Sequence, residues 1–208
     1  VEKISREGYF KDVSFTLHRG EILGLSGLVG AGRTEVVRTI FGAEKITSGS
    51  IYRNGKKVNI NRPLDAIKMG IGLLPENRRK EGLALQLSIE FNINSVVYQG
   101  HSRYGLIDLK KEKELPCKYI RDVKIKTPSS KQKVVKLSGG NQQKVVISKW
   151  LAEQCDILIF DEPTVGIDVG TKQEIYKIMS ELTAQGISII VVSSYLPEVI
   201  GLADNIIV

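Results

Sequence analysis

The feature that most constrains the fold is a glycine-rich loop that joins an apolar segment to a helical pattern near the start of the chain. Residues 21–26 (EILGLS) have the mostly apolar character of a strand, and residues 27–34 (GLVGAGRT) follow as the loop. Apolar side chains then recur at helical spacing up to Gly42, at Val36, Val37, Ile40 and Phe41. A strand that passes through a tight loop directly into a helix favours an α/β fold.

The loop has the spacing of a phosphate-binding loop (P-loop), G-x-x-x-x-G-[K]-[ST], except that an arginine stands at the lysine position. Backbone N–H groups of such a loop cradle phosphates, and the hydroxyl after the basic residue can hold Mg²⁺. The predicted cofactor-binding residues are therefore Gly27, Gly30, Ala31, Gly32, Arg33 and Thr34, with Thr34 also a metal ligand. A chance glycine-rich loop is the alternative, which the flanking strand and helix disfavour.

A second anion-binding pattern lies at residues 137–144 (LSGGNQQK). Ser138 can cap a helix that runs to about Glu153, while Gly139 and Gly140 leave backbone N–H groups with no side chain in the way. A Ser-Gly-Gly turn on its own is usually only a cap. Its functional interpretation depends on the other motifs in the chain.

The third pattern is a pair of carboxylates at the end of a continuous apolar strand. Residues 157–160 (ILIF) read as a fully buried strand of a parallel sheet, and Asp161 and Glu162 follow at once. In phosphate chemistry Asp161 can hold the metal, while Glu162 can orient and deprotonate an attacking water. A surface Asp-Glu pair in a turn is the alternative, which the upstream P-loop disfavours.

The remaining chain alternates strands and helices around an inserted lobe. The alternation in residues 13–17 predicts a strand that reaches the 21–26 strand through a hairpin-like turn. Short strands are predicted at residues 50–53 and 58–60 around Asn54-Gly55, a helix from Pro63 and a buried strand at 71–74. Further strands and helices are predicted after Asp168. We expect one domain, 1–208, with an α/β core (1–76 and 154–208) and a mainly helical subdomain (77–153).

Composition indicates the cellular compartment in which the chain functions and whether it spans a membrane. Of its 208 residues 42% are hydrophobic, yet no apolar run approaches the roughly 20 residues that span a bilayer. Cys117 and Cys155 lie in no metal or redox pattern, which fits a reducing cytoplasm. The chain begins at Val1 and stops inside an apolar run, so we interpret it as a piece of a longer polypeptide.

The net charge of +7 is concentrated in one segment. Residues 110–136, the basic segment, contain ten Lys and Arg against three Asp and Glu, and the rest of the chain is neutral. A solvated face is the plainest interpretation. Contact with an anionic membrane surface or with nucleic acid is the alternative.

Taken together and in this order, the three motifs resemble the nucleotide-binding domain of an ATP-binding cassette (ABC) protein over essentially the whole chain. The stretches LSGGNQQK (137–144), DEPTVGIDVG (161–170) and IGLLPENRRKEGL (71–83) further resemble the second cassette of bacterial importers for monosaccharides such as ribose, galactose and xylose. This resemblance implies a P-loop NTPase core with a mainly parallel sheet, a small antiparallel β part and an inserted helical subdomain.

The resemblance also implies a composite active site that uses ATP and Mg²⁺. The P-loop of one cassette and the Ser138–Gly140 turn of another would enclose each ATP, with Asp168 also among the binding residues. The implied partners are a second cassette in the same polypeptide, transmembrane permease subunits and, indirectly, a sugar-binding protein, without nucleic acid. The chain would then lie peripherally at the cytoplasmic face of the membrane.

Three departures from the family pattern fall on the chain's own P-loop site. Arg33 replaces the lysine, Glu76 replaces a glutamine that contacts metal and water, and Ser194 replaces a histidine that contacts the γ-phosphate. We therefore expect this site to bind nucleotide and hydrolyse it poorly, although the catalytic Glu162 is retained. Two other functions stay open: a soluble ABC ATPase acting on nucleic acid through the basic segment, and a non-hydrolytic nucleotide-sensing module.

Overall fold

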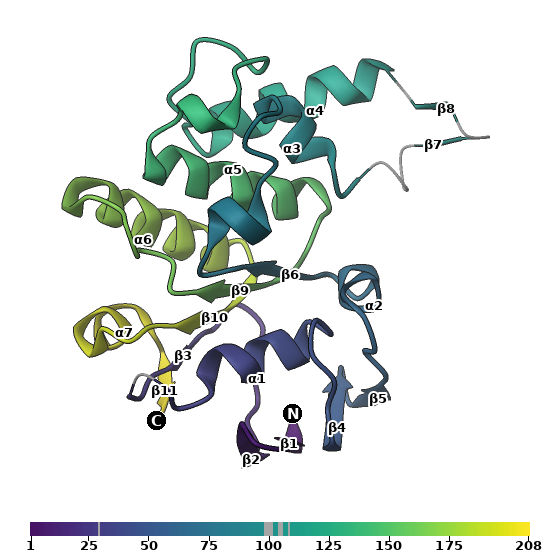
Figure 1. Ribbon diagram of the computed structural model, residues 1–208, viewed down its shortest axis with the longest axis vertical. Coiled ribbons are helices and arrows are strands. Elements are labelled where there is room, and N and C mark those ends of the chain that lie inside the picture. The colour runs from purple at the N-terminus through teal and green to yellow at the C-terminus, as the bar shows by residue number, and fades with distance from the viewer. Residues whose placement is uncertain (29, 98–101, 104–105, 108) are drawn as a thin grey trace. The chain divides into compact units, whose positions relative to one another are not determined.

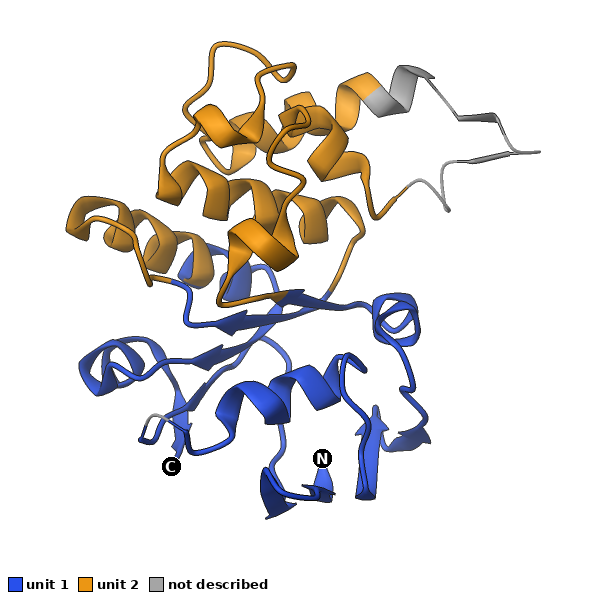
Figure 2. Ribbon diagram, viewed as in Figure 1, with its two compact units in different colours: residues 1–73, 156–163, 180–208 blue, residues 74–155, 164–179 orange. Residues whose placement is uncertain are grey.

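The computed structural model describes residues 1–28, 30–97, 102–103, 106–107 and 109–208. The chain forms two compact units, each built from discontinuous parts of the sequence (Figure 2). Unit 1 comprises residues 1–73, 156–163 and 180–208, and unit 2 comprises residues 74–155 and 164–179. The division into an α/β core (1–76 and 154–208) and a helical subdomain (77–153) stays a prediction.

Unit 1 is organised around a five-stranded sheet in the order β11-β3-β10-β9-β6 (Figure 1). Its strands are β3 (Ile22–Leu25), β6 (Ile71–Leu74), β9 (Ile157–Asp161), β10 (Ser188–Val192) and β11 (Asn205–Ile207). The central β10 pairs in parallel with β3 and β9, and β11 pairs in parallel with β3. Every residue of β3 and β10 is buried, which explains their nearly continuous apolar sequences. The mainly parallel α/β sheet predicted from sequence is confirmed.

Unit 1 also contains helices where the sequence predicts them. They are α1 (Arg33–Ile40), α2 (Pro63–Lys68) and α7 (Leu196–Leu202). The α1 helix contacts β9 and buries Val37 and Ile40, and its C-terminal end passes into Gly42, whose φ is 75°. This contact brings the start of α1, and so the end of the glycine loop, close to Asp161 at the end of β9.

A small antiparallel sheet completes unit 1 in the order β2-β1-β4-β5. Its strands are β1 (Glu2–Arg6), β2 (Phe10–Val13), β4 (Ser48–Arg53) and β5 (Lys56–Val58). Asn54 and Gly55 both have positive φ, 50° and 74°, as a two-residue hairpin turn of the primed type requires. The predicted hairpin is confirmed, with its second strand at 56–58 and not at 58–60.

The strand predicted at residues 13–17 was wrong. The described chain has no regular secondary structure from residue 14 to residue 18, and β2 ends at Val13. The predicted hairpin partners lie in different sheets, because β2 pairs with β1 whereas β3 pairs with β10 and β11. The apolar β3 gains more burial between two parallel neighbours than it would as one arm of a surface hairpin.

Unit 2 is mainly helical, as predicted. It contains a π-helical turn η1 (Arg78–Gly82), α3 (Ile89–Asn94), α4 (Leu109–Asp122), a short 3₁₀ turn (Val134–Lys136), α5 (Gly139–Ala152) and residues 169–179 of α6 (Val169–Ala184). The α5 helix contacts both α3 and α4, and its apolar residues Val145, Val146 and Ile147 are fully buried. A short antiparallel pair, β7 (Ser102–Arg103) and β8 (Leu106–Ile107), was not predicted.

Candidate functional site

The glycine loop passes from β3 into α1 through left-handed backbone conformations. Gly27, Gly30 and Gly32 have φ values of 147°, 85° and 81°, which residues with side chains rarely adopt. Gly32 precedes the first residue of α1, and a Cβ there would lie 2.9 Å from the Tyr9 carbonyl oxygen. Gly32, the N-cap residue, has no side chain that could cap this end of α1. The N–H groups of the first turn are therefore not engaged by an N-cap side chain, which suits a phosphate.

One predicted loop donor is engaged within the loop itself. The N–H of Ala31 donates to the carbonyl oxygen of Leu28 over 3.0 Å, which closes a turn beside Gly30. Val29, in the same loop, lies outside the described residues. Ala31 thus shapes the loop, and its proposed contact with a phosphate would require that turn to open.

The predicted metal ligands lie together behind the loop. Thr34 Oγ1 donates to Asp161 Oδ1 over 3.0 Å, and Asp161 is 1% exposed at the end of β9. A hydroxyl beside a buried carboxylate offers the hard oxygen ligands that Mg²⁺ prefers, with its remaining positions filled by water and phosphate. The donor set fits Mg²⁺. Among the described residues no cluster of three or more His, Cys, Asp or Glu side chains offers another metal site.

The carboxylate of Glu162 is held by Ser194. Its Oε1 accepts from the Ser194 N–H over 2.7 Å and its Oε2 accepts from the Ser194 hydroxyl over 3.2 Å. Glu162 also has a φ of 47°, a rare conformation for a residue with a long side chain. The structure therefore brings together two of the three predicted catalytic residues, with both carboxylate oxygens of Glu162 already engaged.

Arg33 joins the same group of residues. Its Nη1 donates to the Ser193 carbonyl oxygen over 2.6 Å, and its Nη2 lies 3.9 Å from Glu162 Oε1. The side chains of Arg33 and Glu162 are each only 12% exposed. The P-loop arginine is thus bound to the residues that follow β9 and β10. A lysine ammonium lacks the two-pronged geometry that reaches both partners.

In unit 2, Ser138 is the N-cap residue of α5, as predicted, but its side chain makes no capping hydrogen bond to the backbone. The Ser138 carbonyl accepts from Gln142 N–H over 2.9 Å, while its hydroxyl accepts from Asn141 Nδ2 over 2.9 Å. The side-chain amide one turn into the helix outcompetes the backbone N–H groups for this hydroxyl. The exposed hydroxyl still has its own proton to donate.

Gly139 and Gly140 are required by packing inside unit 2. A Cβ on Gly139 would lie 2.7 Å from Arg78 Nη2 and 2.9 Å from the Gly166 carbonyl oxygen. A Cβ on Gly140 would overlap the side-chain methyl of Thr171. The two glycines therefore serve the fold as well as leaving N–H groups uncovered.

Asp168 caps the start of α6. Its carboxylate accepts from the Thr171 N–H over 3.0 Å and from the Thr171 hydroxyl over 2.7 Å. The hydrogen bond from the Thr171 side chain, followed by that from its backbone, lowers the pKa of Asp168 below its ordinary value. The cap gives Asp168 a structural role beside its predicted contact with nucleotide.

Glu76, the third predicted catalytic residue, is exposed just after β6 and belongs to unit 2. That Glu76 lies close to the P-loop residues of unit 1 stays a prediction.

Sequence reasoning missed Ser193 and Arg78. The Ser193 contribution is a backbone carbonyl, which no residue type signals. Arg78 stands within three consecutive basic residues, and nothing in the pattern marks it as the buried one.

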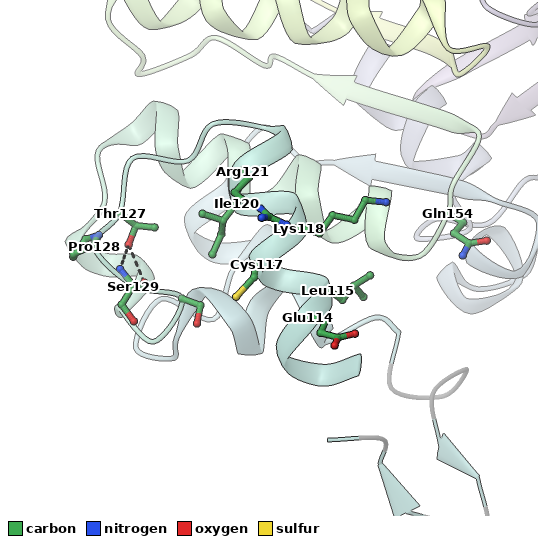
Figure 3. A pocket seen from close by; sticks show the side chains of 11 residues that line it. Glu114, Leu115, Cys117, Lys118, Ile120, Arg121, Thr127, Pro128, Ser129 and Gln154 are labelled. Carbon is green, nitrogen blue, oxygen red and sulfur yellow. Dashed lines mark hydrogen bonds between the residues drawn. The ribbon is translucent and has the colours of Figure 1, made fainter. Parts of the chain in front are cut away.

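A separate hollow of about 910 Å³ lies on unit 2 between α4 and the loop at residues 127–130 (Figure 3). Leu115, Ile120 and Pro128 give it an apolar lining, with Lys118 and Arg121 beside them. None of the predicted site residues lines it.

The fold and these motifs define an ABC-type ATP-binding cassette. Residues 10–165 match the family model described as ABC transporter, and the chain belongs to this family. None of the described helices has the length and apolar character needed to cross a membrane.

The chain is also similar to curated sugar-import proteins. It is 53% identical over 207 residues to a putative ribose/galactose/methyl galactoside import ATP-binding protein of Agrobacterium fabrum, covering 99% of this chain and 41% of that relative. It is 50% identical over 208 residues to the ribose import ATP-binding protein RbsA of Bacillus subtilis, with coverage of 100% and 42%. The chain thus spans about two fifths of the length of the curated relatives it matches.

Solved structures share the fold at low identity. A nucleotide-free ATP-binding cassette from an ABC transporter aligns with a TM-score of 0.80 at 22% identity, covering 99% of this chain and 84% of that structure. A dimeric cassette in a post-hydrolysis state, bound to ADP and Pi, also aligns at 0.80 and 22%, with coverage of 100% and 90%. The predicted ABC cassette fold is confirmed.

Proposed function

We propose that this chain is one ATP-binding cassette of a bacterial monosaccharide importer, and that its P-loop and its Ser138–Gly140 turn serve different ATP sites. Its own P-loop site binds ATP and hydrolyses it poorly. Its Ser138–Gly140 turn completes the ATP site of another cassette, where the terminal phosphate meets the N-terminal end of α5. The names of the relatives support sugar import, and their greater length leaves room for a second cassette.

The observation that carries the proposal is the contact of Arg33 with Ser193 and Glu162. A P-loop basic residue must reach phosphate oxygens, but the Arg33 guanidinium donates to a carbonyl over 2.6 Å. A general base must accept a proton from water, and each oxygen of Glu162 already accepts one hydrogen bond from Ser194, which turns the carboxylate toward that residue. Phosphate must compete with the Ser193 carbonyl for Arg33, and water can use only the acceptor positions of Glu162 that Ser194 leaves open, which favours slow hydrolysis.

The cofactors of this site follow from its oxygen and N–H groups. The first turn of α1 and the loop at Gly27–Gly32 suit the phosphates of ATP, and Thr34 with Asp161 suits Mg²⁺. Bound Mg²⁺ neutralises phosphate charge during phosphoryl transfer. The fixed distance between the Thr34 hydroxyl and Asp161 positions both ligands on one side of the loop.

The proposed partners are a second cassette in the same polypeptide, transmembrane permease subunits and, through them, a sugar-binding protein. The chain would act peripherally at the cytoplasmic face of the membrane. The same Arg33 contact also favours a second candidate, a nucleotide-sensing module that never hydrolyses ATP. The retained Glu162 favours slow hydrolysis over none.

Reconstitution of the full-length protein with its permease subunits and binding protein tests the proposal. We expect ATP-dependent uptake of ribose or galactose into vesicles, and we expect it to be lost in Ser138→Arg while the complex still assembles. Failure of every monosaccharide to stimulate ATP turnover would contradict sugar import. Turnover stimulated by DNA or RNA would favour the nucleic-acid alternative.

A further inference from the structure

Arg78 is a buried cation near the N-terminal end of α5 that the proposed function does not yet use. The residue is 9% exposed and enters from the π-helical turn η1. Its Nη1 donates to the Val165 carbonyl over 2.9 Å, and its Nη2 donates to the Gly166 carbonyl over 3.3 Å. Arg78 therefore holds the segment that leads into the α6 cap.

The same guanidinium lies against the first residue of α5. A Cβ on Gly139 would lie 2.7 Å from Arg78 Nη2 and 2.9 Å from the carbonyl oxygen of Gly166. Only a glycine lets the three groups approach so closely. Arg78 thus fixes the backbone at Gly139 relative to that at Gly166.

The charge of Arg78 has no counter-charge in the described part of the chain. None of its described neighbours pairs it with a carboxylate, and its buried Nε has no hydrogen-bond partner. Burial lowers the pKa of Arg78, with the charge of Arg79 as the second cause, yet arginine stays protonated at neutral pH. The N-terminal end of α5 adds a partial positive charge beside it. This concentration of positive charge is favourable when an anion binds.

We propose that Arg78 is the positioning residue of the anion site at the start of α5. It orders the Gly139 backbone and adds a fixed, largely buried positive charge that strengthens the hold on the terminal phosphate of ATP presented by another cassette. This inference rests on the proposed function of the Ser138–Gly140 turn. The inference gives Arg78, in the segment after β6, a role in ATP binding. The ATP site concerned is the one that the Ser138–Gly140 turn completes, to which Arg33 and Thr34 do not contribute.

The neighbouring Arg79 provides a matched control. Arg79 has the same charge on the same turn but is exposed, and its Nε donates to Gln142 Oε1 over 3.2 Å. We would compare Arg78→Gln, Arg78→Lys and Arg79→Gln in the assembled transporter, measuring KM for ATP and kcat of sugar-stimulated hydrolysis. Removing a buried charge beside the proposed phosphate position should raise KM about tenfold. Arg78→Lys, which keeps the charge, should stay within about threefold of wild type.

Equal KM values in Arg78→Gln and Arg79→Gln would overturn the inference, as would an Arg78→Lys variant whose KM rises as much as that of Arg78→Gln. The second result would leave Arg78 with its hydrogen bonds to Val165 and Gly166 and no contribution from its charge. If Arg78→Gln fails to assemble, Arg78→Lys decides by the same threefold criterion. Ser138→Arg distinguishes a failure of this inference from a failure of the proposed function. Normal ATP hydrolysis in that variant would show that the Ser138–Gly140 turn does not complete an ATP site.

Discussion

The P-loop site of unit 1 and the α5 turn of unit 2 differ in whether a nearby carboxylate balances the charge of an arginine. In unit 1, Arg33 is bound to the Ser193 carbonyl and lies 3.9 Å from the Glu162 carboxylate. In unit 2, Arg78 is buried beside Gly139 without a carboxylate from the described residues. The first region satisfies its own charges, whereas the second leaves positive charge to be met from outside. The α5 turn of unit 2 is therefore better suited than the P-loop site to bind an anion that another protein segment presents.

Blocking the α5 turn should have the largest effect. Ser138 is exposed and its side chain caps nothing, so Ser138→Arg adds bulk without disturbing the packing around Gly139. Loss of preorganised donors to a developing negative charge typically costs about 10²–10³ in rate. We expect sugar-stimulated ATPase activity of the full transporter to fall by at least that factor. Ser138→Ala is the control, and an active Ser138→Arg transporter would contradict the comparison.

Lys149, in the last turn of α5, offers a pH test of a second buried cation in unit 2. Its Nζ donates to the Gly82 carbonyl over 2.8 Å, and burial lowers its pKa to about 8. Above pH 8 the folded protein loses this proton while the unfolded chain keeps it, so stability rises with pH up to the ordinary lysine pKa and is flat below pH 8. Between pH 8 and 9.5 the rise amounts to about 2 kcal/mol.

Urea unfolding of wild type and Lys149→Met at pH 7.5 and pH 9.5 measures this contribution. We expect the stability of wild type relative to the variant to increase with pH by that amount. Lys131→Met, at an exposed position, is the control and should follow wild type. Parallel pH profiles for wild type and Lys149→Met would show that this lysine is not a strained buried cation.

Freeing the P-loop arginine should have a smaller effect. Arg33→Lys loses the bond to Ser193 and places a compact ammonium among the phosphates. We expect ATP·Mg to bind this site roughly threefold to tenfold more tightly, as titration calorimetry would report. Arg62→Lys, at an exposed arginine, should change nothing. Unchanged or weaker binding by Arg33→Lys would contradict the view that internal partners compete with phosphate.

The basic segment should show the smallest effect. Its one aromatic residue, Tyr119, donates its hydroxyl to the Leu151 carbonyl over 2.7 Å, with Lys118 over the ring. Single-strand binding usually relies on several stacking aromatics. We expect no binding to arbitrary DNA or RNA at submicromolar concentration in a titration. Salt-sensitive binding in that range would favour the nucleic-acid function.

Local patterns predicted the elements that position the site, and long-range pairing decided the rest. The strand at β3, the helix α1 and the helix α5 follow from periodicity and glycine positions, which are visible within a short window. The contact between Arg33 and Ser193 joins residues far apart in sequence. Ser138 is the N-cap as predicted, but its hydroxyl pairs with the Asn141 side chain and not with a backbone N–H. The strand predicted at 13–17 was wrong because β3 pairs with β10 and β11.

The central claim is that the two ATP sites to which this chain contributes are unequal. The most direct measurement compares sugar-stimulated hydrolysis by Glu162→Gln and Ser138→Arg in the same full-length transporter. The account predicts that Glu162→Gln keeps a substantial fraction of wild-type turnover, because its carboxylate already serves Ser194 and faces Arg33, while Ser138→Arg is nearly inactive. If Glu162→Gln is as damaging as Ser138→Arg, both sites hydrolyse ATP and the claim is wrong.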